Sequence, residues 1–332
     1  MKRRVFLQSS LGLGALGGLG PAGAAMPATA PLQWRERSLV GFGTVLSLRV
    51  AHAKAAQADQ ALDAAVRVVR HVEDQMSLFN PDSAVSRLNR DGVLRDPDPD
   101  LLQVFQLAQG ISARSSGAFD VTVQPLWTVF EAAQRRGTLP SATAVAQARA
   151  AVGWRRLQVS PQEIRLGGPG MAVTLNGIAQ GFAAGLVRSG LESRGIRHAL
   201  INTGEWSALG RPEPDRPWLL GIADPHEAQA LLGRLAMDGR SVATSSDSET
   251  FFSADHRHHH VFDPRTGYSP TGLSSVTVAA PSCALADALT KVMLNAGGQE
   301  ALRLARAWQV DVLVVDKSGK WQATEGLKLQ AA

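Results

Sequence analysis

The sequence predicts an α+β fold, with mixed sheets and peripheral helices, for this 332-residue chain. Stretches in which apolar residues alternate, as they do in strands, are interspersed with stretches in which they recur at helical spacing. The two kinds do not follow one another in the regular strand–helix–strand cadence of a parallel sheet. At 45% hydrophobic residues the chain can bury a sizeable core, and no repeat or low-complexity tract interrupts it. Residues 31–332 are therefore predicted to form one domain.

The first half of this domain is predicted to open with a strand over residues 38–51, in which glycine permits close approach of the backbone. Residues 54–76 place apolar side chains on one face at helical spacing, and residues 97–116 predict a second helix. We interpret the first of these helices as scaffold. The polar, alanine-rich residues 131–151 predict a peripheral helical excursion, and residues 157–173 predict a hairpin that turns at its Gly-Gly-Pro-Gly run.

The second half mixes short strands with helices. The glycine-bearing stretch at residues 174–183 runs into a helix that continues through Arg194, and the free amides and positive dipole end at the start of such a helix can bind phosphate. The expected strands are residues 198–202, 218–223, 241–247, 273–280 and 310–315, and the other expected helices are residues 282–295 and 299–308.

The chain is organised around a histidine-rich stretch at residues 256–267. On an extended strand His256, His258 and His260 would share one face, while His259 would point to the other. Asp263 and the proline after it end the strand, so an imidazole and a carboxylate are delivered to the lip of a turn. Four imidazoles this close are also compatible with a metal cluster, or with a solvated run that has no function.

The first 30 residues have the pattern of an export signal. Arg3 and Arg4 form a twin arginine ahead of a short Gly/Leu/Ala stretch at residues 11–19, and small-residue cleavage sites follow at residues 22–24 or 28–30. The apolar stretch is short and broken by glycine, so a stable membrane span is not expected. These features predict a twin-arginine signal peptide that is cleaved, and hence a periplasmic protein.

The net charge gives no support to nucleic-acid binding, and the cysteine content excludes a disulfide within the chain. The net charge is +5, and the predicted signal holds three of the basic residues, which leaves the mature chain at +2. So small an excess gives no support to a nucleic-acid partner. The single Cys283 cannot form a disulfide within the chain, so the fold must be stable without one.

Seven motifs in order along the chain give the sequence a family resemblance. Together they resemble the ApbE family, the FAD:protein FMN transferases, over nearly the whole mature chain. They are Phe42-Gly43-Thr44, Ser77-Leu78-Phe79 with Ser86-Arg87-Leu88-Asn89, Gly117-Ala118-Phe119-Asp120, residues 175–181, Ala243-Thr244-Ser245, residues 260–267, and Ala286-Asp287-Ala288-Leu289.

The resemblance implies that the FMN half of FAD is moved to a threonine or serine hydroxyl of an exported acceptor protein, with Mg²⁺ assisting and AMP leaving. By resemblance, His260 is the catalytic residue and acts as general base. Asp287 and the backbone carbonyl of Gly177 would hold the metal, together with a hydroxyl one turn beyond the aspartate. The residues implied to line the FAD pocket are Phe42, Phe79, Ala118, Phe119, Asp120, Thr174, Gln180 and Val261, with Phe79 stacking as an aromatic plate.

Several positions depart from the family pattern. Asn176 and Gln180 stand where the family usually has a glycine and a lysine, and Thr174 replaces the aspartate of the same motif. The Gly-Gly-Asp turn of the family is read here as Gly204-Glu205-Trp206, which keeps an acid one residue short.

The departure with most consequence lies four residues beyond Asp287, where the family threonine is Lys291, with Thr290 one place earlier. Positions three and four residues beyond Asp287 both lie near it on a helix. Two outcomes stay open: Thr290 reaches the metal, or Lys291 pairs with Asp287 and stands in for the cation. The second would make the enzyme less dependent on Mg²⁺ or inactive.

Three other functions remain as alternatives. The same site could hydrolyse FAD to AMP and FMN in the presence of Mg²⁺, with water as the nucleophile. A chain that has lost its chemistry at Lys291 and Gln180 would be a flavin carrier that only holds FAD. The last alternative is a periplasmic binding protein for another solute. Incubation with FAD, with and without an acceptor domain, separates the flavin-based functions.

Overall fold

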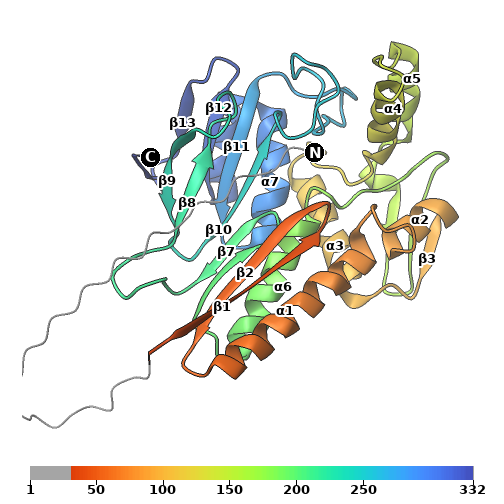
Figure 1. The fold of residues 1–332 in the computed structure, drawn as a ribbon. Helices are drawn as coiled ribbons and strands as arrows, with labels where there is room; N and C mark the ends of the chain where they lie inside the picture. Colours follow the sequence, from red (N-terminus) through yellow and green to blue (C-terminus); the bar gives the residue numbers. More distant parts are fainter. Residues whose placement is uncertain (1–30, 332) are drawn as a thin grey trace, which may run out of the picture.

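The structure, a computed structural model, describes residues 31–331, so the predicted signal of residues 1–30 lies outside the described residues. Helices and strands are intermixed along the chain, as predicted, and the α+β class is confirmed (Figure 1). The helices are α1 Ala55–Met76, α2 Ala84–Asp91, α3 Pro99–Arg114, α4 Gln124–Gln134, α5 Ala142–Ala151, α6 Ala179–Ser193, α7 Cys283–Ala296 and α8 Gly298–Trp308. The strands are β1 Gln33–Gly41, β2 Thr44–His52, β3 Val93–Arg95, β4 Leu157–Val159, β5 Glu163–Leu166, β6 His198–Asn202, β7 Trp206–Leu209, β8 Leu219–Ala223, β9 Leu231–Ala236, β10 Ser241–Ser246, β11 Leu273–Ala280, β12 Asp311–Asp316, β13 Trp321–Ala323 and β14 Leu329–Gln330.

An eight-stranded sheet in the order β1-β2-β6-β7-β10-β11-β12-β13 forms the centre, and all its neighbouring strands pair antiparallel. Its two faces are covered differently because side chains alternate along each strand. On β12, Val312 and Val314 face the helices, while Leu313 and Val315 face a small sheet of order β14-β9-β8. A third sheet, β3-β5-β4, lies apart. Helices α1, α6 and α7 pack on the first face, which fixes the position of the residues on α7 (Figure 1).

Most predicted elements are confirmed to within two residues at each end. The strand predicted over residues 38–51 is instead a hairpin, β1 and β2, whose turn residues Phe42 and Gly43 have φ of 50° and 76°. Positive φ at both central positions matches the right-handed twist of the strands. The hairpin of β4 and β5 turns at residues 160–162, so the glycine run that was predicted to be its turn follows it. The excursion at 131–151 consists of the end of α4 and all of α5, and α4 begins earlier, at Gln124, because Pro125 suits the first turn of a helix.

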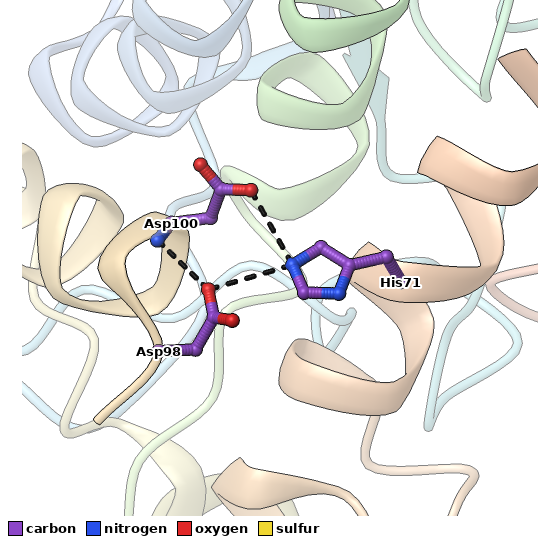
Figure 2. A group of neighbouring side chains, drawn as sticks. All are labelled: His71, Asp98 and Asp100. Carbon is purple, nitrogen blue, oxygen red and sulfur yellow. Dashed lines mark hydrogen bonds and ion pairs between the residues drawn. The ribbon is translucent and has the colours of Figure 1, made fainter. Parts of the chain in front are cut away.

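A polar contact joins α1 to the start of α3 (Figure 2). The side chain of Asp98 caps α3 by accepting the N–H of Asp100, and His71 Nε2 lies 3.4 Å from a carboxylate oxygen of each aspartate. Three such groups could in principle hold a metal ion. The capping bond accounts for the position of Asp98, however, and the His71 side chain is 42% exposed. We interpret the group as a surface contact between two helices.

None of the helices within residues 31–331 combines the length and apolar character needed to cross a membrane.

Candidate active site

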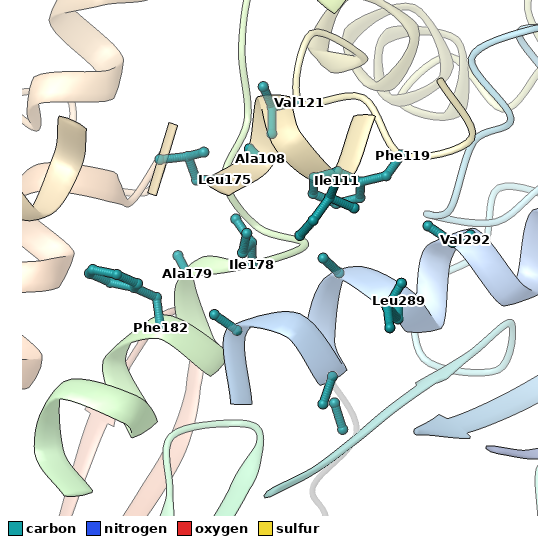
Figure 3. Packing of buried hydrophobic residues seen from close by; sticks show 14 of the residues in the cluster. Ala108, Ile111, Phe119, Val121, Leu175, Ile178, Ala179, Phe182, Leu289 and Val292 are labelled. Carbon is teal, nitrogen blue, oxygen red and sulfur yellow. The ribbon is translucent and has the colours of Figure 1, made fainter. Parts of the chain in front are cut away.

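A cleft is formed where α6 and α7 meet the loops at residues 118–123 and 174–178. Apolar side chains of the same segments, such as Phe119, Leu175 and Leu289, pack together in the largest part of the core (Figure 3). Segments that are far apart in the sequence therefore meet at one place. All eight residues predicted to contact FAD line this cleft, together with His260, Gly177 and Lys291: Phe42, Phe79, Ala118, Phe119, Asp120, Thr174, Gln180 and Val261.

His260 reaches the cleft from the loop between β10 and β11. Its Nδ1 lies 3.3 Å from the carbonyl oxygen of Thr250, and its backbone N–H donates to the same oxygen. A carbonyl only accepts, so Nδ1 carries the proton and Nε2 keeps its lone pair. Burial lowers the pKa of His260, and Lys291 acts in the same direction. The imidazole is therefore neutral at pH 7 and suited to take up a proton.

The other histidines of the run do not share a face, and the predicted strand is wrong. Residues 253–260 form turns, with a single bridge between Phe251 and His259 and a φ of 56° at His256. His256 stacks on Phe251 at 4.2 Å, and His258 packs near the ring of Phe130. The run holds no metal cluster, because within residues 31–331 the one group of three potential ligands is that of His71. Alternation predicted a strand, but the His256 and His258 rings pack against different partners, Phe251 and Phe130 of α4.

His259 should make the protein sensitive to acid. Its ring is fully buried, Nε2 donates to the carbonyl of Pro270, and burial lowers its pKa from 6.5 to about 4. In the unfolded chain the ordinary pKa applies, so the unfolded state binds one more proton between these two values. Stability is therefore lost as the pH falls from about 6.5 to about 4, by about 3 kcal/mol.

Urea unfolding at neutral and acidic pH tests this prediction. The variant His259→Gln should be less stable than the wild-type protein at neutral pH, because glutamine does not fill the space of the buried ring. Its free energy of unfolding should nevertheless fall less than that of the wild-type protein on acidification. An equal loss in both proteins would show that the acid sensitivity arises elsewhere.

Asp287 lies on α7, is 1% exposed, and contacts the cleft residue Lys291. Its Oδ2 accepts the backbone N–H of Gly181 at 3.1 Å. Its Oδ1 accepts from the Lys291 ammonium at 2.5 Å, and that ammonium also donates to the Asp287 carbonyl at 3.1 Å. Asp287 and Lys291, one turn apart on α7, thus form an ion pair at the position where the metal was predicted.

Thr290 does not face the carboxylate of Asp287. Its hydroxyl donates to the backbone carbonyl of Asp287 at 2.6 Å and accepts from the Ser245 hydroxyl at 2.7 Å. The residue is fully buried and is not part of the cleft lining. Of the two outcomes that the sequence left open, the described geometry matches the pairing of Lys291 with Asp287.

Glu205 is a cleft residue that the sequence-based site omitted. It is buried, and its carboxylate accepts the N–H of Thr244 at 3.1 Å. Burial raises the pKa of Glu205 well above its ordinary value, nearby Asp287 raises it further, and Lys291 opposes the shift. The sequence signal for Glu205 is its place in the Gly204-Glu205-Trp206 turn, where it supplies the acid of the family turn one residue short. Trp127 and Glu249 also line the cleft, but no motif in the sequence predicted a place for them in the site.

Of the residues implied to bind FAD, Asp120 mainly supports the protein's own structure. The carboxylate of Asp120 accepts from the N–H and hydroxyl of Thr122 and from the N–H of Trp154, so it ties two loops together beside the cleft. Burial raises its pKa, and these hydrogen bonds oppose that shift. Phe79, by contrast, is 70% exposed at the cleft mouth, with its ring against Gly43. That position suits a plate on which a planar ring stacks.

The helix start predicted as a phosphate site is largely occupied. The N–H of Ala179 donates to the carbonyl of Leu175, and the N–H of Gly181 donates to Asp287. Amides already bonded within the protein are poor phosphate donors. The cationic group facing the cleft beside this turn is instead Lys291, whose stem lies against Gly177.

Comparison with known proteins gives a consistent result. The family model described as the ApbE family matches residues 42–314. A protein of Klebsiella pneumoniae named FAD:protein FMN transferase is 31% identical over 78% of this chain and 84% of its own length. A protein of the same name from Vibrio cholerae is 30% identical over 76% of this chain and 78% of its own. Among solved structures, the apo form of the Pseudomonas stutzeri flavinyl transferase ApbE superposes with a TM-score of 0.76 and 26% identity, over 88% of this chain and 94% of that one.

Proposed function

The chain belongs to the ApbE family, and from this premise we propose that it is an FAD:protein FMN transferase. The observation that supports this most is the convergence of distant segments on one cleft. A neutral imidazole, an anchored ammonium and an exposed aromatic plate line the same cavity, which also contains every residue that was predicted to contact FAD. Concave sites with a few convergent polar groups are typical ligand sites.

In this reaction the hydroxyl of a threonine or serine in the acceptor attacks the phosphorus of the FMN half of FAD. A new P–O bond forms to the acceptor, the P–O bond to the bridging oxygen breaks, and AMP leaves with that oxygen. His260 Nε2 would accept the proton of the attacking hydroxyl. The Lys291 ammonium would face the negative charge on the diphosphate.

The resemblance also predicts Mg²⁺, held by Asp287, the Gly177 carbonyl and a hydroxyl. The side chains as arranged do not fit that ion. Mg²⁺ requires near-octahedral oxygen ligands at about 2.0–2.1 Å. One oxygen of Asp287 is bonded to an ammonium, the other to an amide, and the Thr290 hydroxyl is turned to the backbone. The proposed reaction therefore has no step at a metal in this site.

The proposed setting is the periplasm, after twin-arginine export and removal of the signal. Its support is the sequence around Arg3 and Arg4, and the acceptor would be an exported electron-transfer protein with a modifiable threonine or serine. Replacing both arginines with lysine and locating the protein by cell fractionation tests this part of the proposal. Unchanged export would contradict it.

Incubation of the mature protein with FAD and candidate acceptor domains tests the activity. The expected result is a fluorescent acceptor band in a denaturing gel, with one AMP released for each FMN attached. A control acceptor whose target hydroxyl has been removed should stay dark. Free FMN without labelling would instead indicate FAD hydrolysis, and unchanged FAD would indicate a carrier.

A further inference from the structure

We propose that the Lys291 ammonium occupies the place on Asp287 that a divalent cation would take, so that the cleft carries its cation as part of the chain and binds a diphosphate without a metal. The proposal rests on the proposed function only for the identity of that diphosphate, FAD. The pairing of the two side chains stands on its own geometry.

Both oxygens of Asp287 have partners within the protein. Each of its oxygens accepts one hydrogen bond from the protein, Oδ1 from Lys291 and Oδ2 from Gly181. Almost no solvent reaches the carboxylate, which is 1% exposed. A divalent ion at Oδ1 would lie close to the ammonium, and the two positive charges would repel each other at that range.

Lys291 is held in this position by its surroundings. Its side chain is 16% exposed, and the Cε and Cδ atoms would lie 3.2 and 3.6 Å from a Cβ on Gly177. A second bond, to the Asp287 carbonyl at 3.1 Å, fixes the ammonium further. An ammonium can donate three hydrogen bonds, and Lys291 lines the cleft, so the same group can also donate to a phosphate oxygen.

The hydroxyl expected to complete a metal site has other partners. The Thr290 hydroxyl bonds the Asp287 carbonyl and the Ser245 hydroxyl, both within 2.7 Å. Reaching the carboxylate side of Asp287 would break both bonds in a fully buried place. The Thr290 hydroxyl and the Asp287 carboxylate are therefore not arranged as ligands of one magnesium ion, and the Lys291 ammonium supplies a positive charge at the carboxylate instead.

Metal titration of three proteins tests the proposal. Calorimetry with MgCl₂ should give no binding at the cleft of the wild-type chain. The variant Lys291→Thr leaves Asp287 without its ammonium partner and adds a hydroxyl, so it should bind Mg²⁺ at least roughly tenfold more tightly than the weakest affinity that the wild-type titration would detect. The matched control is Lys317→Met, which removes the lysine of another lysine–aspartate pair, with Asp247, outside the cleft lining.

Tight Mg²⁺ binding by the wild-type protein, or an equal gain in both variants, would overturn the proposal. FAD binding gives a second measurement that does not need Lys291→Thr to fold. Wild-type affinity for FAD should be the same in excess EDTA and in MgCl₂, whereas Lys291→Met should weaken it roughly ten- to a hundredfold. Loss of FAD affinity in EDTA would also overturn the proposal. Failure of acceptor labelling bears on the proposed function alone, because neither titration requires turnover.

Discussion

Replacing His260 with alanine is expected to lower the rate of FMN transfer by roughly 10²–10⁴-fold while FAD remains bound. The reason is the tautomer that Thr250 imposes, which leaves Nε2 as the proton acceptor facing the cleft. Single-turnover labelling of an acceptor gives the rate, and flavin fluorescence gives the affinity for FAD. Transfer at an undiminished rate would remove His260 from the mechanism.

The control for this experiment is His258→Ala, in the same loop. Its ring packs beside Phe130 and Tyr268 and does not line the cleft, so transfer should change little even if stability falls. The pH profile adds a readout that a structural role would not move. The base works when unprotonated, and burial lowers the pKa of His260, so the acidic limb of kcat/KM should lie below the ordinary histidine value of 6.5.

Replacing Gly181 with alanine is expected to destabilise the protein by about 3 kcal/mol or more and to lower Tm by roughly 10 °C. A Cβ at this position of α6 would lie 2.8 Å from the Cβ of Asp287 and 2.7 Å from the carbonyl carbon of Cys283 on α7. Both obstacles belong to a buried helix, so the two helices must separate. The separation would also weaken the bond from the Gly181 amide to Asp287.

Gly185→Ala, one turn further along α6, serves as the matched control. No atom of the described residues lies within 4 Å of a Cβ built there, outside the helix itself and the neighbouring residues. The same substitution should therefore stabilise the protein by about 0.5–1 kcal/mol, because alanine favours the helix. Equal Tm values for the two variants would show that the α6–α7 contact is looser than the structure indicates.

Local patterns in the sequence predicted the helices and most strands, because amphipathic spacing and capping are properties of neighbouring residues. The ordered motifs also predicted which loops share the cleft. The strand predicted for the histidine run is wrong, and one of its histidines, His258, packs against Phe130 of α4, more than 100 positions earlier in the chain. Periodicity carries no information about such a partner.

Hydrogen-bond partners were the other limit of sequence reasoning. No residue near Gly181 in the sequence indicates that its amide donates to Asp287. The sequence therefore predicted that the start of α6 could bind phosphate. Helical spacing placed both Thr290 and Lys291 near Asp287, and only the contact with Ser245 separates their orientations. The sequence thus identified Thr290 and Lys291 as possible partners of the Asp287 side chain. The packing of α7 against β10 determines that Lys291 is the partner.

The salt bridge between Lys291 and Asp287 in α7 has a consequence for how the cleft obtains its positive charge. An ion drawn from the medium occupies its site in proportion to supply, and chelators can strip it away. A charge borne by residue 291 is synthesised with the polypeptide, in a stoichiometry of one for every molecule that folds. The Lys291 ammonium cannot dissociate, cannot be exchanged for another cation, and does not depend on the concentration of divalent ions around the protein.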